Sequence, residues 1–132
     1  MSKAHPLVTL ETIVLVGIGG FAGSNLRYFV GLFVPGLEGT LLVNVLGSFA
    51  LGFLLYEAIH VGIVSSETKM AATTGFLSSF TTYSTFAVET VQQTPALAVA
   101  NVVGSYALGF AGVLVGRALV HRLDSRSNGR RT

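Results

Sequence analysis

The sequence has no cysteine and no tryptophan, and it is poor in charged residues. Without cysteine, neither disulfides nor thiolate metal sites can form. Charged residues make up 11% of the 132 residues, whereas an average soluble domain carries about 25%, and 51% of the residues are hydrophobic. So little charge cannot cover a water-facing surface. The composition therefore indicates a single domain that has the lipid bilayer as its solvent.

Four apolar segments are long enough to span a bilayer as helices, which takes about 20 residues each. They cover residues 13–34, 40–60, 70–91 and 96–120, and they lack the alternation of a membrane barrel. No cleavable signal peptide is expected, because the first apolar segment is full length. The sequence thus predicts an all-α, multi-pass protein of the cell membrane. Its four-helix domain covers residues 1–123, and a basic polar tail covers 124–132.

Basic residues outside the spans gather on one predicted side of the membrane. With four spans, that side holds both termini and the second loop, and the opposite loops contain no basic residue. The positive-inside rule predicts that this side is cytoplasmic. The basic tail fits anionic lipid headgroups better than nucleic acid. Glu57, His60 and His121 lie at span ends and are expected at the interface. The basic residues on this side are Lys3, Lys69, Arg122, Arg126, Arg130 and Arg131.

A ten-residue cassette occurs twice, as NVLGSFALGF from Asn44 and as NVVGSYALGF from Asn101. Its asparagine and serine stand at i and i+4 on one helical face. Packing between helices explains such residues, but a buried amide is costly unless it is paired, and polar groups inside the membrane often line a permeation path. For the two asparagines we favour a role in lining a permeation path. For the two serines we leave both roles, helix packing and lining the path, open. The glycines expected to pack helices closely are Gly47, Gly52, Gly104, Gly109, Gly112 and Gly116.

The third segment contains GFLSSFTTYSTF, in which six of twelve residues are serine or threonine. Such residues bond to backbone carbonyls and loosen a membrane helix, so this run suits a helix that offers hydroxyls and free carbonyls to an ion. Glu89 follows it as either an interfacial or a pore carboxylate. Arg27 in the first segment is either a snorkelling anchor or a fixed charge that attracts anions to a vestibule. No catalytic triad, metal-ligand spacing or P-loop is present, and no enzyme is predicted.

The motifs GGFAGSNLRY, GTLLVNVLGSFALG and above all GFLSSFTTYSTF resemble the Fluc-type (CrcB-like) fluoride channels. The resemblance implies an antiparallel, dual-topology dimer with two fluoride pores and a central structural sodium ion, and a third helix broken in mid-membrane. Backbone carbonyls of Ser78 and Thr81 would ligate sodium, and oxygen ligands suit a hard cation. Arg27 matches the first-helix arginine. The positions that match the pore are Asn44, Tyr83, Ser84, Thr85, Phe86, Glu89, Asn101 and Ser105.

The chemistry of these residues suits a small anion, which gives up its hydration shell and needs donors in return. Asn44 offers amide N–H groups, while Ser84, Thr85 and Ser105 offer hydroxyls. The rings of Phe86 and Tyr83 carry partial positive charge at their edges. The choice of fluoride over chloride rests on the resemblance alone.

The sequence departs from the family pattern at three places. Ser78 and Ser79 replace a glycine pair, Tyr83 replaces a phenylalanine, and Asn101 stands where some members have tyrosine. The added Tyr83 hydroxyl changes the geometry that an anion meets at that position. The serines do not affect the proposed sodium ligand, because that ligand is a backbone carbonyl.

The resemblance predicts passive fluoride export that lowers cytoplasmic fluoride toxicity, through a homodimer or a heterodimer with an inverted homologue. The one-sided basic charge favours the second arrangement, and the complete motif favours the first. One alternative is a small multidrug-type exporter that exchanges cations for protons. This class needs a carboxylate in mid-span, and no acidic residue of this sequence is predicted at such a position. The other alternative, a non-transporting structural subunit, leaves the third-segment run unexplained.

Overall fold

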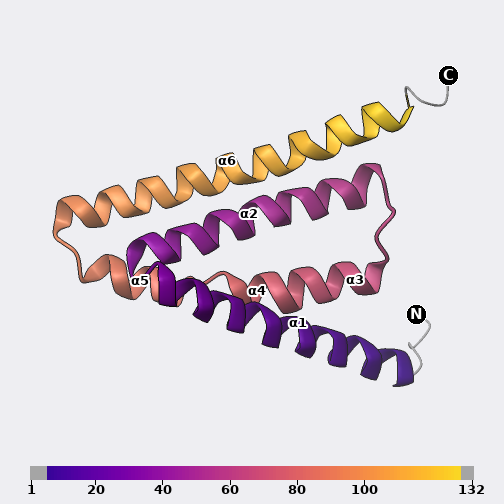
Figure 1. The fold of residues 1–132 in the computed structure, drawn as a ribbon, viewed down its shortest axis with the longest axis horizontal. Coiled ribbons are helices and arrows are strands. Elements are labelled where there is room, and N and C mark those ends of the chain that lie inside the picture. The colour runs from indigo at the N-terminus through magenta and orange to yellow at the C-terminus, as the bar shows by residue number, and fades with distance from the viewer. Residues whose placement is uncertain (1–5, 129–132) are drawn as a thin grey trace.

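A computed structural model describes residues 6–128, and these residues form helices and connecting turns without strands. Three of the helices are long, and four short helical segments follow one another between the second and the third (Figure 1). The elements are α1 (Pro6–Phe33), α2 (Leu37–His60), α3 (Ser66–Met70), the π-helical η1 (Ala71–Leu77), α4 (Ser78–Phe80), α5 (Ser84–Val91) and α6 (Pro95–Asn128).

Among the described residues, three helical stretches are long and apolar enough to cross a membrane: Leu7–Phe33, Leu37–His60 and Pro95–Ser125. They match the predicted spans 13–34, 40–60 and 96–120 and begin before each of them; the first ends one residue earlier, at Phe33. The predicted span 70–91 corresponds to the segments from the end of α3 to α5, which are separate helical pieces. α6 runs on to Asn128, so the first residues of the predicted polar tail are helical.

The helices pack as two pairs. α2 lies along α6, and α1 lies along the α3–η1–α4 segments, with fewer contacts between the pairs (Figure 1). Within each pair the chains run in the same direction, which is the arrangement expected of the two segments that carry the repeat. The start of α1, the α2–α3 loop and the end of α6 all lie at one end of the bundle (Figure 1).

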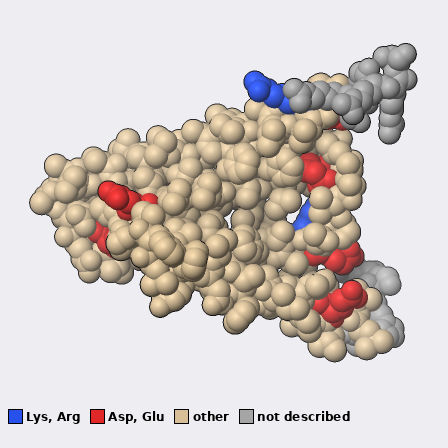
Figure 2. All heavy atoms as spheres, viewed as in Figure 1, with Lys and Arg blue, Asp and Glu red and all other residues tan. Residues whose placement is uncertain are grey.

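Few side chains are buried between the helices. The buried hydrophobic residues are Val43, Leu77, Phe80 and Val120, while Phe21 on α1 is 73% exposed. On the face seen in Figure 2, charged side chains gather at the two ends and leave an uncharged middle. Because lipid tails solvate apolar side chains, a membrane protein needs no large apolar core, and this distribution agrees with a bilayer around the middle of the bundle.

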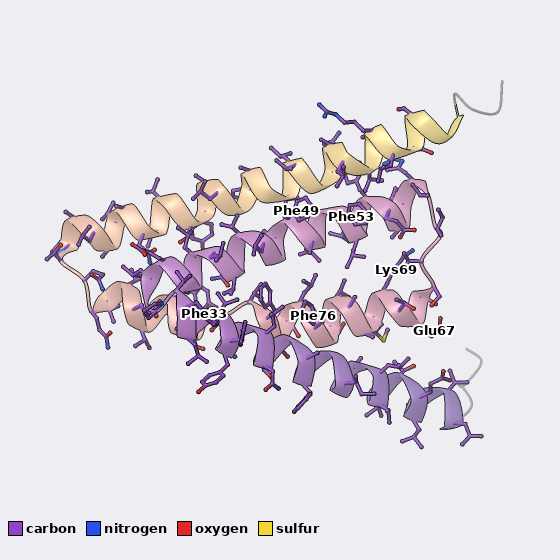
Figure 3. The ribbon with its side chains drawn as sticks, viewed as in Figure 1. Phe33, Phe49, Phe53, Glu67, Lys69 and Phe76 are labelled. Atoms are coloured by element: carbon purple, nitrogen blue, oxygen red, sulfur yellow. The ribbon has the colours of Figure 1, made fainter. Side chains whose placement is uncertain are left out.

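Glycines let the main chains within each pair approach closely. A Cβ on Gly52 would lie 2.5 Å from the Val113 carbonyl oxygen, and one on Gly116 would collide with the main chain at Phe49 and lie 2.7 Å from the Phe53 nitrogen (Figure 3). In the other pair, a Cβ on Gly75 would lie 2.5 Å from the Val16 carbonyl oxygen. Contacts of this kind allow van der Waals packing and stabilise helix pairs in membranes.

Two of the cassette glycines do not pack α2 against α6. A Cβ on Gly47 would collide with the side chain of Thr81, and Gly104 has no atom within 4 Å of such a Cβ. The prediction of close helix packing is therefore confirmed at Gly47, which packs against the segment around Thr81 instead of α6, and it fails at Gly104. It is also confirmed at Gly52 and Gly116 and at Gly112, where a Cβ would lie 3.0 Å from the Val45 carbonyl oxygen.

Glu57, which the sequence predicted at the membrane interface, is buried by the loop that follows it. Its Oε1 accepts hydrogen bonds from the backbone N–H groups of Ile63 (2.6 Å) and Val64 (2.9 Å), and its Oε2 lies 3.2 Å from Lys69 Nζ. Figure 3 shows Lys69 on the α3 side of this loop. Glu57 thus closes the α2–α3 turn, and its burial follows from loop contacts that hydropathy does not report.

The glycine contacts lead to a matched test. We expect Gly116→Ala to lower the stability of the detergent-solubilised protein, because the added methyl group meets main-chain atoms that cannot move aside. Overpacking of this kind costs about 1–3 kcal/mol. Gly17→Ala is the control, since a Cβ there meets nothing within 4 Å. Thermal unfolding of both variants measures the difference. Equal melting temperatures would contradict the close α2–α6 packing.

Candidate functional site

The helical segments between α3 and α5 are interrupted at Thr81–Tyr83. α4 ends at Phe80, Thr81 takes an extended conformation (φ −81°, ψ 161°), and α5 begins at Ser84. Hydroxyls loosen the chain just before this point. Ser78 Oγ donates to the Thr74 carbonyl, and Thr81 Oγ1 donates to the Leu77 carbonyl at 2.9 Å. Serine and threonine that bond back to their own helix bend it, which explains why the run GFLSSFTTYSTF breaks here.

Asn44 on α2 holds the interrupted segment by two reciprocal hydrogen bonds. Its Nδ2 donates to the Thr82 carbonyl at 2.9 Å, and its Oδ1 accepts from the Thr82 backbone N–H at 2.8 Å. The Asn44 side-chain amide therefore pairs with the N–H and carbonyl of Thr82, as a neighbouring main chain would. One of the two N–H groups on Nδ2 is committed to Thr82, and the second stays available to another acceptor.

Two carbonyls lose their helical donors at the interruption. In a continuous α-helix the Thr82 N–H would donate to the Ser78 carbonyl and the Thr85 N–H to the Thr81 carbonyl. Instead, Thr82 N donates to Asn44 Oδ1, and Thr85 N donates to Thr82 Oγ1 at 3.2 Å. The carbonyls of Ser78 and Thr81 are thereby free of those partners. Both residues line a cavity of about 400 Å³ beside α2, which Asn44 and Thr73 also line.

Arg27 supports the same segment from α1. It is half-buried, and its Nε donates to the Ser79 carbonyl at 3.0 Å. It also lines a second cavity of about 400 Å³, here called the vestibule, with Thr40, Thr85 and Glu89 among its walls. Glu89 Oε2 is buried without a hydrogen-bond partner in the described part of the chain. The vestibule therefore holds one cation and one carboxylate near the interruption.

A mainly apolar groove with a few polar side chains, here called the groove, runs where α2, α5 and α6 meet. Its volume is about 280 Å³. The rings of Tyr83 and Phe86 stand in it with their centroids 5.9 Å apart and tilted by 43°, and Tyr83 is 74% exposed. The residues that line it are Asn44, Ser48, Tyr83, Phe86, Ser105, Tyr106, Gly109, Phe110 and Val113. Amide, hydroxyl and ring-edge donors thus line one open channel-shaped surface.

A chain of side-chain hydrogen bonds joins α5 to α6 next to the groove. Asn101 Nδ2 donates to Thr90 Oγ1 at 2.7 Å, and Thr90 Oγ1 donates to the Phe86 carbonyl at 2.6 Å. Ser105 Oγ donates to Asn101 Oδ1 at 3.4 Å. The asparagine of the second cassette therefore positions α5, and its serine lies in the groove.

The structure brings the predicted residues together in three places. Asn44, Tyr83, Phe86 and Ser105 meet in the groove. Arg27, Thr85 and Glu89 meet in the vestibule, and Ser78 and Thr81 line the cavity beside α2.

Two predicted pore residues lie outside these spaces. Asn101 bonds to Thr90, and Ser84 Oγ lies 3.4 Å from Thr82 Oγ1, but neither lines any of the three cavities. The analysis of the sequence missed Thr82 and Thr90 as site residues. Thr90 stands four residues after Phe86, a spacing that could have indicated it, whereas nothing local relates Thr82 to Asn44.

These features define a multi-pass helical membrane protein with a groove that carries amide and hydroxyl donors beside an interrupted helical segment. The chain matches the family described as CrcB-like protein, Camphor Resistance (CrcB), over residues 14–117, and it belongs to that family.

Similar proteins carry a common name. The chain is 79% identical over 120 residues to the Fluoride-specific ion channel FluC 1 of Haloarcula marismortui, covering 91% of this chain and 94% of that one. It is 50% identical to the Fluoride-specific ion channel FluC 1 of Natronomonas pharaonis, over 83% of this chain and 94% of the other. It is 49% identical to the Fluoride-specific ion channel FluC 2 of Halobacterium salinarum, over 85% and 88%.

The bonds from Asn44 predict a loss of stability on substitution. Asn44→Ala removes a donor and an acceptor from the Thr82 backbone, which then stays unpaired in a part-buried site. The cost is about 1–3 kcal/mol for each unsatisfied group, and we expect the melting temperature to fall by several degrees. Ser48→Ala is the control, because Ser48 Oγ donates only to a carbonyl of its own helix. If both variants melt alike, Asn44 does not hold the interruption.

Proposed function

We propose that the chain is a fluoride-selective channel that passively exports fluoride across the cell membrane and so lowers cytoplasmic fluoride toxicity. The observation that carries this proposal is the groove, in which Asn44, Phe86 and Ser105 meet in a chain 79% identical to a protein named as a fluoride-specific ion channel. The function is that of an ion channel and not of an enzyme. The alternative of a multidrug-type exporter finds no support in the relatives, whose names specify fluoride.

The groove offers an anion the donors that replace its hydration shell. Asn44 contributes its second amide N–H, and Ser105 can exchange its 3.4 Å bond to Asn101 for a bond to the ion. Phe86 and Tyr83 present ring edges, which carry partial positive charge. Each donor lies on a helix whose position other contacts already fix, so no large rearrangement is needed for the ion to bind.

Two further hydroxyls lie at the start of α5. Thr85 Oγ1 accepts from Thr82 Oγ1 at 3.1 Å, which leaves the Thr85 proton free to donate towards the vestibule. Ser84, which is exposed, extends the polar surface from the interruption. Asn101 contributes by orienting Ser105 and, through Thr90, the backbone of Phe86.

The vestibule is proposed as the entry for the anion. Arg27 supplies a positive charge close to the interruption and attracts anions by Coulomb forces, while its bond to the Ser79 carbonyl fixes the guanidinium in place. Glu89 faces the same space, and its carboxylate limits how strongly the anion is held. An ion that must pass on should bind only moderately at each point of its path.

The segments α3, η1, α4 and α5 are proposed to form a fourth span, broken in mid-membrane. Non-helical backbone at that depth is tolerated only where it is buried in protein or lines a water-filled cavity. Asn44 and Arg27 satisfy backbone groups of this segment, and three cavities border it. A fourth span also puts the start of α1 and the end of α6 on one side of the membrane.

The proposed assembly is an antiparallel, dual-topology dimer, either of two copies or with an inverted homologue. The groove is open on one side, and Tyr83, Tyr106 and Phe110 around it are 74%, 55% and 68% exposed. A second subunit laid over this face would cover the aromatic rings and close the groove into a pore. The numbered names FluC 1 and FluC 2 of the relatives are compatible with paired homologues.

A sodium ion is proposed at the centre of the dimer, held by the carbonyls of Ser78 and Thr81 and their counterparts in the other subunit. The donor set fits, because both carbonyls have lost their helical N–H partners and oxygen-only ligands suit a hard cation. Bound there, sodium would supply a positive charge that joins the two interrupted segments. Lipid surrounds the remaining apolar surface.

Fluoride efflux from proteoliposomes tests this function directly. We expect the purified protein to release fluoride passively, as read by a fluoride electrode, and to release no chloride. Phe86→Ala should slow the efflux by about tenfold or more, which corresponds to ~1.4 kcal/mol in the barrier. Phe21→Ala is the control, because Phe21 lies on α1 with its ring 73% exposed and lines none of the three cavities.

Two results would overturn the proposal. One is the absence of fluoride efflux from protein that is folded and inserted, and the other is cation export driven by a proton gradient. Normal efflux through Phe86→Ala would agree with a fluoride channel but would show that fluoride does not pass through the groove.

A further inference from the structure

A cluster of rings and cations, here called the Tyr56 cluster, joins the ends of α2 and α6. It lies at the opposite end of α2 from the vestibule. The Tyr56 ring centroid is 4.9 Å from that of His60 and 5.7 Å from that of His121, and the two imidazoles are 5.5 Å apart. Arg117 stacks on Tyr56 with its guanidinium carbon 4.7 Å from the ring centroid. The channel proposed above uses none of these four residues.

The polar groups of the cluster are uncommitted. Within the described part of the chain, no hydrogen bond or ion pair engages the Arg117 guanidinium or a ring nitrogen of either histidine. Stacking on Tyr56 orients the planar guanidinium and leaves its N–H edge free. A planar guanidinium with a free edge binds the two oxygens of a phosphate or carboxylate in a bidentate manner.

The acids near the cluster do not neutralise it. Glu57 precedes His60 by one turn, but its carboxylate is occupied by Ile63 N, Val64 N and Lys69 Nζ. Asp124 follows His121 by one turn on α6 and forms no ion pair with the cluster. Arg117 therefore keeps its full positive charge beside two imidazoles that can donate hydrogen bonds, and an anion is the ligand that this arrangement favours.

The depth of the cluster matches the headgroup layer. His60 ends α2, and Arg117 stands 22 residues after the start of α6 at Pro95. At 1.5 Å per residue these positions lie roughly 33–35 Å along each helix from its start, which is slightly more than the ~30 Å of the hydrocarbon core. Since α2 and α6 start at the same end of the bundle (Figure 1), both halves of the cluster reach the same interface.

We propose that the Tyr56 cluster binds the phosphate of an anionic phospholipid headgroup. The Arg117 guanidinium donates to the phosphate oxygens, and His60, His121 and the Tyr56 hydroxyl surround them. The match to the family covers residues 14–117, so His121 lies outside the matched residues. The site pins the ends of α2 and α6 to the membrane surface and is independent of the path for fluoride.

Lipid retention measures this site without reference to transport. The protein is incubated with vesicles of phosphatidylglycerol and phosphatidylcholine, extracted in mild detergent, and its bound lipids are counted by native mass spectrometry. We expect wild type to retain phosphatidylglycerol selectively, and Arg117→Gln to retain about tenfold less, as for the loss of a charge-assisted bond. Arg122→Gln is the matched control, because it removes one charge from the same helix end without a ring contact.

Further variants keep the test decisive if Arg117→Gln folds poorly. Arg117→Lys keeps the charge but not the bidentate edge, and it should retain an intermediate amount. His60→Gln combined with His121→Gln should also reduce retention. Equal retention by Arg117→Gln and Arg122→Gln, both folded, would overturn the site. Release of phosphatidylglycerol by millimolar inorganic phosphate would overturn the lipid as its ligand, because free phosphate would then be the preferred partner.

Discussion

The structure depends on the pair of hydrogen bonds between the Asn44 amide and the backbone of Thr82. Inside a bilayer, an unpaired backbone group costs several kcal/mol because no water can replace its partner. The chain can leave its helix at Thr81–Tyr83 only because other groups supply the missing bonds. Asn44 from α2 supplies two, Thr82 Oγ1 supplies one to Thr85, and Arg27 from α1 caps the Ser79 carbonyl. The interruption, the groove and the vestibule all follow from these bonds.

The two Asn44 bonds also join the two helix pairs. Glycines bring main chains together within each pair, but few contacts connect α2 and α6 to α1 and its partner segments. Asn44 reaches the interrupted segment from α2 and so links the two pairs, while Arg27 on α1 holds the same segment from within its own pair. Close packing therefore stabilises each pair, and polar contacts set how the pairs meet. The cavities lie where the polar contacts are, so the residues that fix the fold at this point are also those that line the proposed path for the anion.

Much of this arrangement could be predicted from the sequence, and the exceptions have a common cause. Hydropathy located α1, α2 and α6, because a long apolar run has few other structures open to it. The density of hydroxyls in GFLSSFTTYSTF indicated a loosened helix, and the family resemblance implied that this helix is broken near Ser78 and Thr81. The residue that satisfies the interruption could not be read locally, since Asn44 and Thr82 are 38 positions apart. The repeated cassettes do not tell the roles of Asn44 and Asn101 apart, yet Asn44 bonds to the Thr82 backbone and Asn101 to the Thr90 hydroxyl.

The errors concern contacts that form only when segments fold together. Glu57 stands at a span end, but no pattern indicated that the following loop folds back and buries its carboxylate. Gly104 has the same neighbours in sequence as Gly47, yet it meets nothing within 4 Å. The Tyr56 cluster draws its four members from two helices, and no spacing along the chain relates His60 to His121. The hydropathy pattern of the sequence identifies the helices, whereas contacts between distant residues determine the role of each polar side chain.

The central claim is that one Asn44 amide both holds the interruption and serves the ion. Magic-angle-spinning NMR tests it most directly, on protein with ¹⁵N-labelled asparagine and ¹³C-labelled threonine in bilayers that contain fluoride. Asn44→Ser identifies the signal. The account predicts that Asn44 Nδ2 is dipolar-coupled to the Thr82 carbonyl carbon and, in the same sample, to ¹⁹F of the fluoride ion. A signal coupled to Thr82 alone, or one that loses Thr82 when fluoride binds, would contradict it.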